Sequence, residues 1–118
     1  MRIISGNFRG RKLIKFNKEG IKPTTDKMRE SIFNIVISYL KVNEKNNNVP
    51  LKNFTVLDIF AGTGALGIEA ISRGAEKVTF IEKSRDNLNV LYKNIDLLKI
   101  SEKVKIIKRS IRKVKKIN

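Results

Sequence analysis

The sequence predicts an α/β fold: a parallel sheet with the strand order 3-2-1, preceded by a basic β-hairpin and a helix. Two observations carry this prediction. Between Thr55 and Lys108, apolar segments with the period of strands alternate with segments that have the period of helices. A glycine-rich turn, Gly-Thr-Gly-Ala-Leu-Gly, lies where the first of these strands gives way to a helix. Strand-helix-strand connections of this kind are right-handed crossovers, which make successive strands parallel.

Residues 1–45 are expected to form an N-terminal appendage. Arg2–Ser5 and Phe8–Phe16 alternate apolar and basic residues around Gly6-Asn7, which predicts a short hairpin. A helix is predicted over Asp26–Leu40, with Thr24 or Thr25 as its N-terminal cap. The apolar residues that recur there at helical spacing are Met28, Ile32, Ile35, Val36, Tyr39 and Leu40.

Residues 46–118 are expected to form the sheet domain. A linker over Lys41–Asn53, with three consecutive asparagines and Pro50, joins it to the appendage. The helix after the glycine turn is expected to end at Gly74. The predicted strands are Thr55–Phe60, Val78–Glu82 and Val104–Lys108, and the predicted helices are Ala65–Arg73 and Ser84–Leu98.

The composition excludes several kinds of chemistry. The 118 residues include no cysteine and no histidine. Disulfides, zinc sites built from cysteine and histidine, and catalysis by Ser-His-Asp or Cys-His groups are therefore excluded within the chain, and no metal is expected. No apolar run approaches the roughly 18 residues of a membrane span, and the N-terminus is too charged for a signal peptide. We therefore expect a soluble, cytoplasmic protein.

The net charge of +15 is concentrated at the two ends of the chain. Residues 1–30 carry nine Lys/Arg against three Asp/Glu, and residues 99–118 carry nine against one, whereas residues 31–98 carry eight against seven. One interpretation is a polyanionic partner, most simply nucleic acid. The other is compositional, because A/T-biased coding enriches lysine, isoleucine and asparagine and raises the isoelectric point without any such partner.

The glycine turn predicts a nucleotide-binding loop. Glycine lets a strand turn directly into a helix and lets a ligand approach backbone that no Cβ obstructs, which suits Gly62, Gly64 and Gly67. Glu82 follows Gly62 by 20 residues, at the end of the second predicted strand, where a carboxylate can bind ribose hydroxyls. The alternative is a helix start that packs closely against a strand and binds nothing.

Asp58 favours one class of cofactor over another. Ribose binding by Glu82 suits both NAD and S-adenosylmethionine. A dinucleotide places an anionic pyrophosphate over the loop, where the carboxylate of Asp58 would oppose it. S-adenosylmethionine instead carries an ammonium and a sulfonium cation, which Asp58 favours directly or through water. The alternative for Asp58 is capping of the loop's backbone amides, and its presence disfavours an NAD-dependent oxidoreductase in either case.

Several stretches together resemble a known family. "VLDIFAGTGALGIEA" with "VTFIEKS" is similar to the cofactor half of a Rossmann-like S-adenosylmethionine methyltransferase. "RIISGNFRGRKL", "IKPTTDKMRESIFN" and "LDIFAGTGALGIEAISRGA", in this order, resemble the N-terminal portion of the RsmD family, bacterial enzymes that methylate the exocyclic amine of one guanine in small-subunit ribosomal RNA. The resemblance implies S-adenosylmethionine as the cofactor and ribosomal RNA or the small ribosomal subunit as the partner.

The resemblance also implies roles for individual residues. On the cofactor side these are Asp58, Phe60, Ala61, Gly62 and Gly64 around the methionine part, Glu82 at the ribose, Lys83 beside the adenine, and Ser110 where the family usually has Asp or Asn. On the RNA side they are Arg9, Arg11 and Lys12 of the hairpin, with Thr24, Thr25 and Arg29 near the mouth of the pocket. The alternative for Arg29 is a charge on the helix surface.

One part of the family's pattern has no counterpart here. Family members carry Asp/Asn-Pro-Pro-Phe/Tyr after a fourth strand, whereas the two prolines of this chain, Pro23 and Pro50, are not adjacent. That motif orients the target amine, which is otherwise a poor nucleophile. The first strand, normally central in a doubly wound sheet, would lie at an edge. We therefore expect an N-terminal portion of a methyltransferase that is inactive alone; the alternative is a non-catalytic, basic RNA-binding module with part of the fold.

Overall fold

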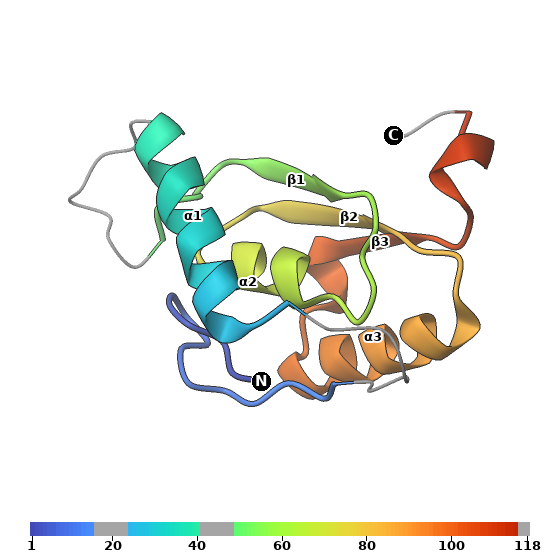
Figure 1. Cartoon of the computed structure of the whole chain (residues 1–118), viewed down its shortest axis with the longest axis horizontal. Helices are drawn as coiled ribbons and strands as arrows, with labels where there is room; N and C mark the ends of the chain where they lie inside the picture. Colours follow the sequence, from blue (N-terminus) through green and yellow to red (C-terminus); the bar gives the residue numbers. More distant parts are fainter. Residues whose placement is uncertain (16–23, 41–48, 116–118) are drawn as a thin grey trace.

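The computed structural model describes residues 1–15, 24–40 and 49–115. Within them, three parallel strands form one sheet in the order β1-β2-β3, as the sequence predicts (Figure 1). The strands are β1 (Thr55–Asp58), β2 (Lys77–Ile81) and β3 (Val104–Ile107). Phe16 of the expected hairpin, Pro23 and most of the expected linker lie outside the described residues.

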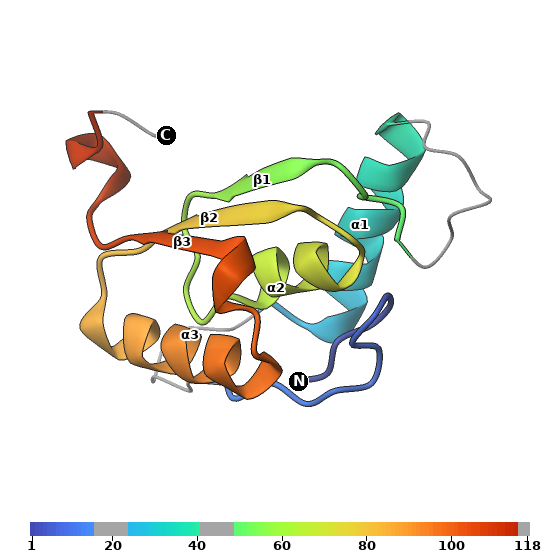
Figure 2. The ribbon, with the colours of Figure 1, turned by 180° about the vertical axis from the view of Figure 1, so that it is seen from behind.

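Three helices accompany the sheet, each with bounds within one residue of its prediction: α1 (Asp26–Leu40), α2 (Ala65–Ser72) and α3 (Arg85–Leu98). Two 3-10 turns, η2 (Ser101–Lys103) and η3 (Ile111–Lys113), flank β3. Helices α2 and α3 lie on the same face of the sheet (Figures 1 and 2), because both crossovers are right-handed and step in the same direction along it.

The core lies between the sheet and these two helices. Val78 and Phe80 of the central strand are fully buried, and so are Ile68 of α2 and Leu91 of α3. Gly67 permits the close contact, since a Cβ at that position would lie 2.2 Å from Cε1 of Phe80. Strand β1 is more exposed than β2, and its outer face is open to solvent.

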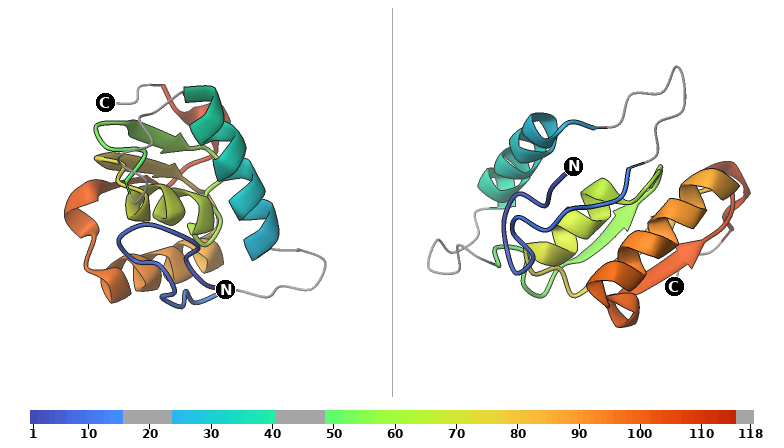
Figure 3. Two further views of the ribbon diagram at one scale, coloured as in Figure 1. Left: turned by 90° about the vertical axis from the view of Figure 1, so that its left-hand side faces the viewer. Right: turned by 90° about the horizontal axis from the view of Figure 1, so that it is seen from below.

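The predicted hairpin does not form two regular strands. Residues 1–15, which we call the N-terminal arm, contain one isolated antiparallel bridge between Arg2 and Lys12 in place of two paired strands. The amides of residues 4 and 5 donate instead to the Glu69 carboxylate, at 2.9 and 3.1 Å. Figure 3 shows the N-terminal arm lying alongside α2. Backbone hydrogen bonds of 2.8–2.9 Å still join the two segments, from Ile3 to Arg11, from Gly10 to Ile3 and from Leu13 to Met1, while the amides of residues 4 and 5 bind α2.

Helix α1 contacts α2 through residues that the apolar spacing did not indicate. Its buried residues are Arg29 and Phe33. Nε of Arg29 donates to the Glu69 carboxylate at 3.4 Å, and the guanidinium carbon of Arg73 lies 4.8 Å from the centroid of the Phe33 ring. Five of the six residues in the predicted apolar series are exposed: Met28, Ile32, Ile35, Val36 and Tyr39. Helix α1 therefore has an apolar surface that the described residues leave uncovered.

None of the helices in the described ranges combines the length and the apolar character that a membrane span requires.

Candidate cofactor site

The candidate site lies where β1 turns into α2. The predicted strand Thr55–Phe60 ends early, at Asp58, and the turn occupies residues 59–64. Gly62 and Gly64 have φ angles of 56° and 93°, in the left-handed region that favours glycine. A Cβ on Gly62 would meet no atom within 4 Å. The backbone at Gly62 is thus open to a ligand, whereas Gly64 packs against Leu91.

Glu82 holds the loop against the end of β2. Its Oε1 accepts from the amide of Gly62 at 2.8 Å, while Oε2 accepts from the amides of Lys83 and Ser84 at 3.1 and 2.8 Å. Buried Ala61 adds a further tie, because its amide donates to the last carbonyl of β2 at 3.1 Å. A carboxylate offers about four acceptor positions, so three amides leave room for one more donor such as a hydroxyl.

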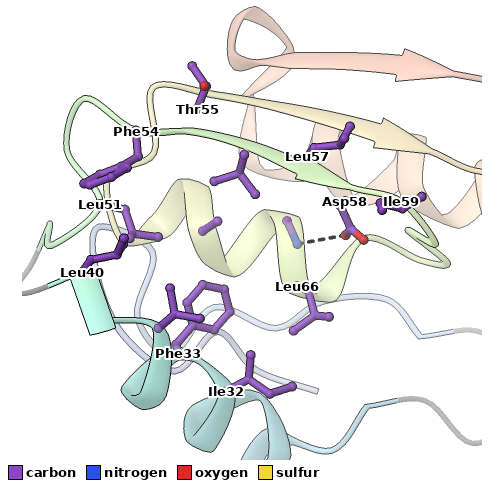
Figure 4. A pocket seen from close by; sticks show the side chains of 14 residues that line it. Ile32, Phe33, Leu40, Leu51, Phe54, Thr55, Leu57, Asp58, Ile59 and Leu66 are labelled. Carbon is purple, nitrogen blue, oxygen red and sulfur yellow. Dashed lines mark hydrogen bonds between the residues drawn. The ribbon is translucent and has the colours of Figure 1, made fainter. Parts of the chain in front are cut away.

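Asp58 ends β1 and points toward α2 (Figure 4). Its Oδ2 accepts from the amide of Gly67 at 3.2 Å, in the first turn of a helix that has no side-chain cap from Gly64. Asp58 therefore performs the capping role that was its alternative interpretation. Burial raises the pKa of Asp58; the Gly67 hydrogen bond opposes that rise, and the nearby charge of Glu82 adds to it. A cation beside Asp58 would favour its ionised form.

A polar pocket of about 360 Å³ opens beside this loop. Phe60 from the turn, Glu82 and Lys83 from the end of β2, and Ser110 from the segment after β3 all line it. Four of the predicted cofactor residues, from three strand ends, therefore share one pocket. The Phe60 side chain is 81% exposed, which leaves its ring free for a planar ligand. The Ser110 hydroxyl accepts from the Arg112 amide at 3.3 Å and so caps η3.

The residues predicted to contact RNA lie in different environments. Arg9, Arg11 and Lys12 are exposed on the N-terminal arm. Thr25 caps α1 by accepting from the third amide of the helix at 3.1 Å, and Thr24 beside it is half-buried. Arg9, Arg11 and Lys12 are therefore exposed to solvent, whereas Thr25 has a role within the fold.

Arg29 is fully buried, so the surface position considered for it is wrong. Its Nη2 donates to Asp26 at 3.0 Å and to the carbonyl of Arg2, and its Nε donates to Glu69. The guanidinium thus joins α1, the N-terminal arm and α2. Because the Arg29 side chain has no exposed surface, it contacts protein groups rather than solvent.

Buried polar residues that the sequence patterns did not indicate hold the N-terminal arm on α2. The Glu69 carboxylate binds two amides of the arm and the guanidinium groups of Arg29 and Arg73. Ser72, one turn later, accepts from the Phe8 amide at 3.0 Å and donates to the Ser5 carbonyl at 2.6 Å. The signal was present, because an acidic residue interrupts the otherwise apolar segment ALGIEA.

Asn94 joins the N-terminal arm to the glycine loop. It lies on α3 and is fully buried. Its Oδ1 accepts from the Ile14 amide at 2.8 Å, and its Nδ2 donates to the carbonyls of Ile14 and Thr63 at 2.9 and 3.2 Å. Because Thr63 stands between Gly62 and Gly64, one side chain positions both the arm and the candidate cofactor loop.

The family model described as "Conserved hypothetical protein 95" matches residues 1–117. The chain belongs to this family. Its curated relatives include the Ribosomal RNA small subunit methyltransferase D of Haemophilus influenzae, 43% identical over 111 residues, and that of Escherichia coli, 41% identical over 99 residues. The family indicated by the sequence stretches is thus confirmed.

This member of the family spans about half the length of the curated relatives it matches. The alignment with the Haemophilus influenzae enzyme covers 93% of this chain and 52% of the relative, and that with the Escherichia coli enzyme covers 84% and 44%. The solved structure of yhhF from Escherichia coli superposes with a TM-score of 0.73 at 34% identity, covering 93% of this chain and 52% of yhhF. The three-stranded sheet therefore resembles part of a methyltransferase fold.

Proposed function

We propose that this chain binds S-adenosylmethionine at the carboxyl ends of its strands and serves the methylation of a guanine exocyclic amine in small-subunit ribosomal RNA. One observation supports the cofactor most strongly: Phe60, Glu82 and Ser110, from three strand ends, line one pocket beside the glycine loop. The names of the Haemophilus influenzae and Escherichia coli relatives, both ribosomal RNA small subunit methyltransferases, support the substrate.

The residues at the site fit this cofactor. The Glu82 carboxylate, oriented by three backbone amides, is proposed to accept from a ribose hydroxyl. Burial raises the pKa of Asp58. A nearby ammonium or sulfonium group would stabilise the ionised carboxylate of this residue. Lys83 and Ser110 are proposed to border the adenine, and Phe60 is proposed to lie at the methionine part. A dinucleotide fits less well, because it would bring a pyrophosphate toward two carboxylates.

The contribution of these residues is positioning. S-adenosylmethionine supplies a methyl group on a sulfonium, so the transfer needs no metal and no covalent enzyme intermediate. The glycine loop, Asp58 and Glu82 hold one reactant, while the family's Asp/Asn-Pro-Pro-Phe/Tyr motif orients the other. The 118 residues contain no adjacent prolines. We therefore propose that this polypeptide alone transfers no methyl group, and methylation of ribosomal RNA by the isolated chain would contradict that.

The RNA is proposed to contact the exposed basic residues of the N-terminal arm, Arg9, Arg11 and Lys12, with Thr24 and Thr25 nearby. Arg29 is omitted from this set because its guanidinium is buried. The exposed residues Lys83, Arg109 and Arg112 line the polar pocket and add positive charge beside it. Both basic ends of the chain thus offer cations to phosphate groups.

Calorimetry with S-adenosylmethionine, S-adenosylhomocysteine and NAD tests the cofactor site. We expect saturable binding of the first two, and a loss of roughly tenfold or more in Asp58→Ala and Glu82→Gln, since a hydrogen bond to a charged group contributes about 1.5–3 kcal/mol. Glu102→Gln is the matched control, because Glu102 is exposed in η2, before β3 and far from the strands' carboxyl ends. Binding of NAD alone would contradict the proposal.

The clustering of Lys and Arg residues at the two ends of the chain also favours a second function, a non-catalytic RNA-binding module. Such a module would bind RNA while showing no cofactor binding in the same calorimeter. In either case log K for RNA should fall by roughly 0.7–0.9 per neutralised phosphate for each unit of log salt. A flat salt response would instead indicate that the high charge is compositional.

A further inference from the structure

Asn94 of α3 is hydrogen-bonded to the N-terminal arm and to the glycine loop at the same time. Its side-chain amide binds both backbone groups of Ile14, at 2.8 and 2.9 Å, and donates to the Thr63 carbonyl at 3.2 Å. A primary amide has two donor hydrogens and one acceptor oxygen, and these contacts use both its nitrogen and its oxygen. Asn94 is not among the residues that line the polar pocket. An effect of Asn94 on a ligand in that pocket therefore passes through the loop.

The arm side of this contact carries exposed cations. Lys12 and Lys15 lie close to Ile14 in the chain, and both are exposed. The Ile14 side chain is itself 41% exposed, so packing contributes little to its position. Because Asn94 binds both the amide and the carbonyl of Ile14, it pairs with this residue as a neighbouring strand would. A phosphate group held by Lys12 would thus act on a segment that Asn94 positions.

The loop side of this contact is part of the candidate cofactor site. Thr63 is half-buried, three residues after Phe60, which lines the polar pocket. The next residue, Gly64, packs on α3, because a Cβ there would lie 2.3 Å from Cδ1 of Leu91. Leu91 and Asn94 are three residues apart and so lie on one face of the helix. Helix α3 therefore supports the loop through one apolar contact and one hydrogen bond, and the hydrogen bond is shared with the arm.

We propose that Asn94 is a positioning residue that couples the arm to the loop, so that RNA on the arm and S-adenosylmethionine at the loop strengthen each other's binding. A ligand that holds the arm fixes Ile14 and, through Asn94, restricts Thr63. A second ligand then binds a loop that is already ordered and loses less conformational entropy. Such a coupling is reciprocal between the two ligands. This inference rests on the proposed function, from which it takes its two ligands, and adds the link between their sites.

Ser72 provides the comparison that separates coupling from stability alone. Like Asn94, it is fully buried and binds the arm through two hydrogen bonds, from the Phe8 amide and to the Ser5 carbonyl. Both of these hydrogen bonds reach the arm and neither reaches the glycine loop. Ser72→Ala therefore loosens the arm without removing a contact of the loop, and it is the matched control for Asn94→Ala.

Amide exchange tests the link without any ligand. In Asn94→Ala we expect faster exchange at Ile14 and also at Gly64, whose amide donates to the Ala61 carbonyl within the loop at 2.9 Å. The increase should be at least about fivefold, the lower end of usual coupling between sites. In Ser72→Ala only the arm, at Phe8, should exchange faster. Unchanged exchange at Gly64 in Asn94→Ala, or equal acceleration there in both variants, would overturn the proposal.

A calorimetric cycle tests the consequence for binding. S-adenosylmethionine would be titrated into the wild-type chain with and without saturating small-subunit ribosomal RNA made by transcription. We expect at least about fivefold tighter binding with RNA, and the same factor for RNA when the cofactor is present. Asn94→Ala should lose this factor and Ser72→Ala should keep it, with circular dichroism to verify that both are folded.

Equal affinities with and without RNA in the wild-type chain would overturn the coupling, and this result does not depend on how well either variant folds. Loss of the factor in Ser72→Ala as well would overturn the role of Asn94, because loosening the arm anywhere would then have the same effect. Absence of S-adenosylmethionine binding in every protein would overturn the proposed function, and it is distinct from binding that RNA leaves unchanged. The exchange at Gly64 needs neither ligand and tests the link between arm and loop in each case.

Discussion

The two sides of α2 differ in what covers them: the N-terminal arm is hydrogen-bonded to one side, and the other side borders an open apolar groove. On one side, Glu69 and Ser72 bind the N-terminal arm through four hydrogen bonds to its backbone. On the other side, an apolar groove between α1 and β1 stays open. A buried polar group without a hydrogen-bond partner lowers the free energy of unfolding by about 1–3 kcal/mol. The Glu69 carboxylate and the Ser72 hydroxyl therefore find their partners within the described residues, whereas part of the apolar surface there stays uncovered.

The largest loss of stability is expected from a substitution of Glu69, which lies at the centre of the hydrogen-bonded side of α2. Glu69→Gln removes the negative charge between Arg29 and Arg73, both of them buried. Uncompensated buried charges of this kind typically lower the free energy of unfolding by about 3–5 kcal/mol. Urea unfolding monitored by circular dichroism would measure this.

Glu76→Gln is the control for Glu69→Gln, because Glu76 is an exposed glutamate just after α2. Its substitution should stay within about 0.5 kcal/mol of the wild type, as is usual for surface changes. If both variants unfold at the same urea concentration, the ion pairs of Glu69 do not stabilise the fold.

A smaller loss is expected at Asn94. Asn94→Ala leaves the backbone groups of Ile14 and the Thr63 carbonyl without their partners, which should lower the free energy of unfolding by about 1–3 kcal/mol. The amide of Ile14 should also exchange faster with solvent. Asn89→Ala, at an exposed position on α3, is the control. Unchanged exchange at Ile14 in Asn94→Ala would show that the arm is held by other contacts.

The boundary between the two sides is Asp58, which lines the groove and caps α2. Since its pKa is raised in the folded state, the folded protein binds this proton more tightly than the unfolded chain. The free energy of unfolding should therefore fall as the pH rises from the ordinary aspartate pKa to the raised value. Asp58→Asn keeps an acceptor for the Gly67 amide but should lose this dependence.

Urea unfolding across the acidic pH range measures the difference between the two proteins. Asp96→Asn, an exposed position on α3, is the control and should follow the wild type. A parallel pH profile for Asp58→Asn and the wild type would contradict the raised pKa. The same variant in calorimetry would show whether loss of the charge also weakens S-adenosylmethionine, as the proposed function requires.

Local sequence patterns predicted the sheet and the helices well. The alternation of periods between Thr55 and Lys108 located every strand and α-helix in that range, though not the 3-10 turn η2, because each of those elements is specified by its own apolar spacing and turn residues. The glycine loop, with Asp58 and Glu82 at adjacent strand ends, was also predictable, since parallel strands bring their carboxyl ends to one edge.

The errors concern contacts between distant segments. Alternating residues predicted a hairpin, but backbone donors of the arm bind Glu69 and Ser72, more than 60 positions away. Arg29 was assigned to the mouth of the pocket, with a surface charge as the alternative, because its buried partner on α2 cannot be seen from local spacing. Glu69, an acidic residue inside an apolar segment, is the one local sign of these contacts.

The smallest effect on stability is expected on the open side of α2, at Val36. Val36 is 38% exposed at the groove, so Val36→Asp removes little packing and should change the free energy of unfolding by no more than about 0.5 kcal/mol. Phe33→Ala, three residues earlier and buried against Arg73, should cost about 3–5 kcal/mol. Urea unfolding of the two variants thus compares the closed and open surfaces of one helix. A large loss in Val36→Asp would mean that Val36 is packed in the isolated chain and that the two surfaces of the helix do not differ.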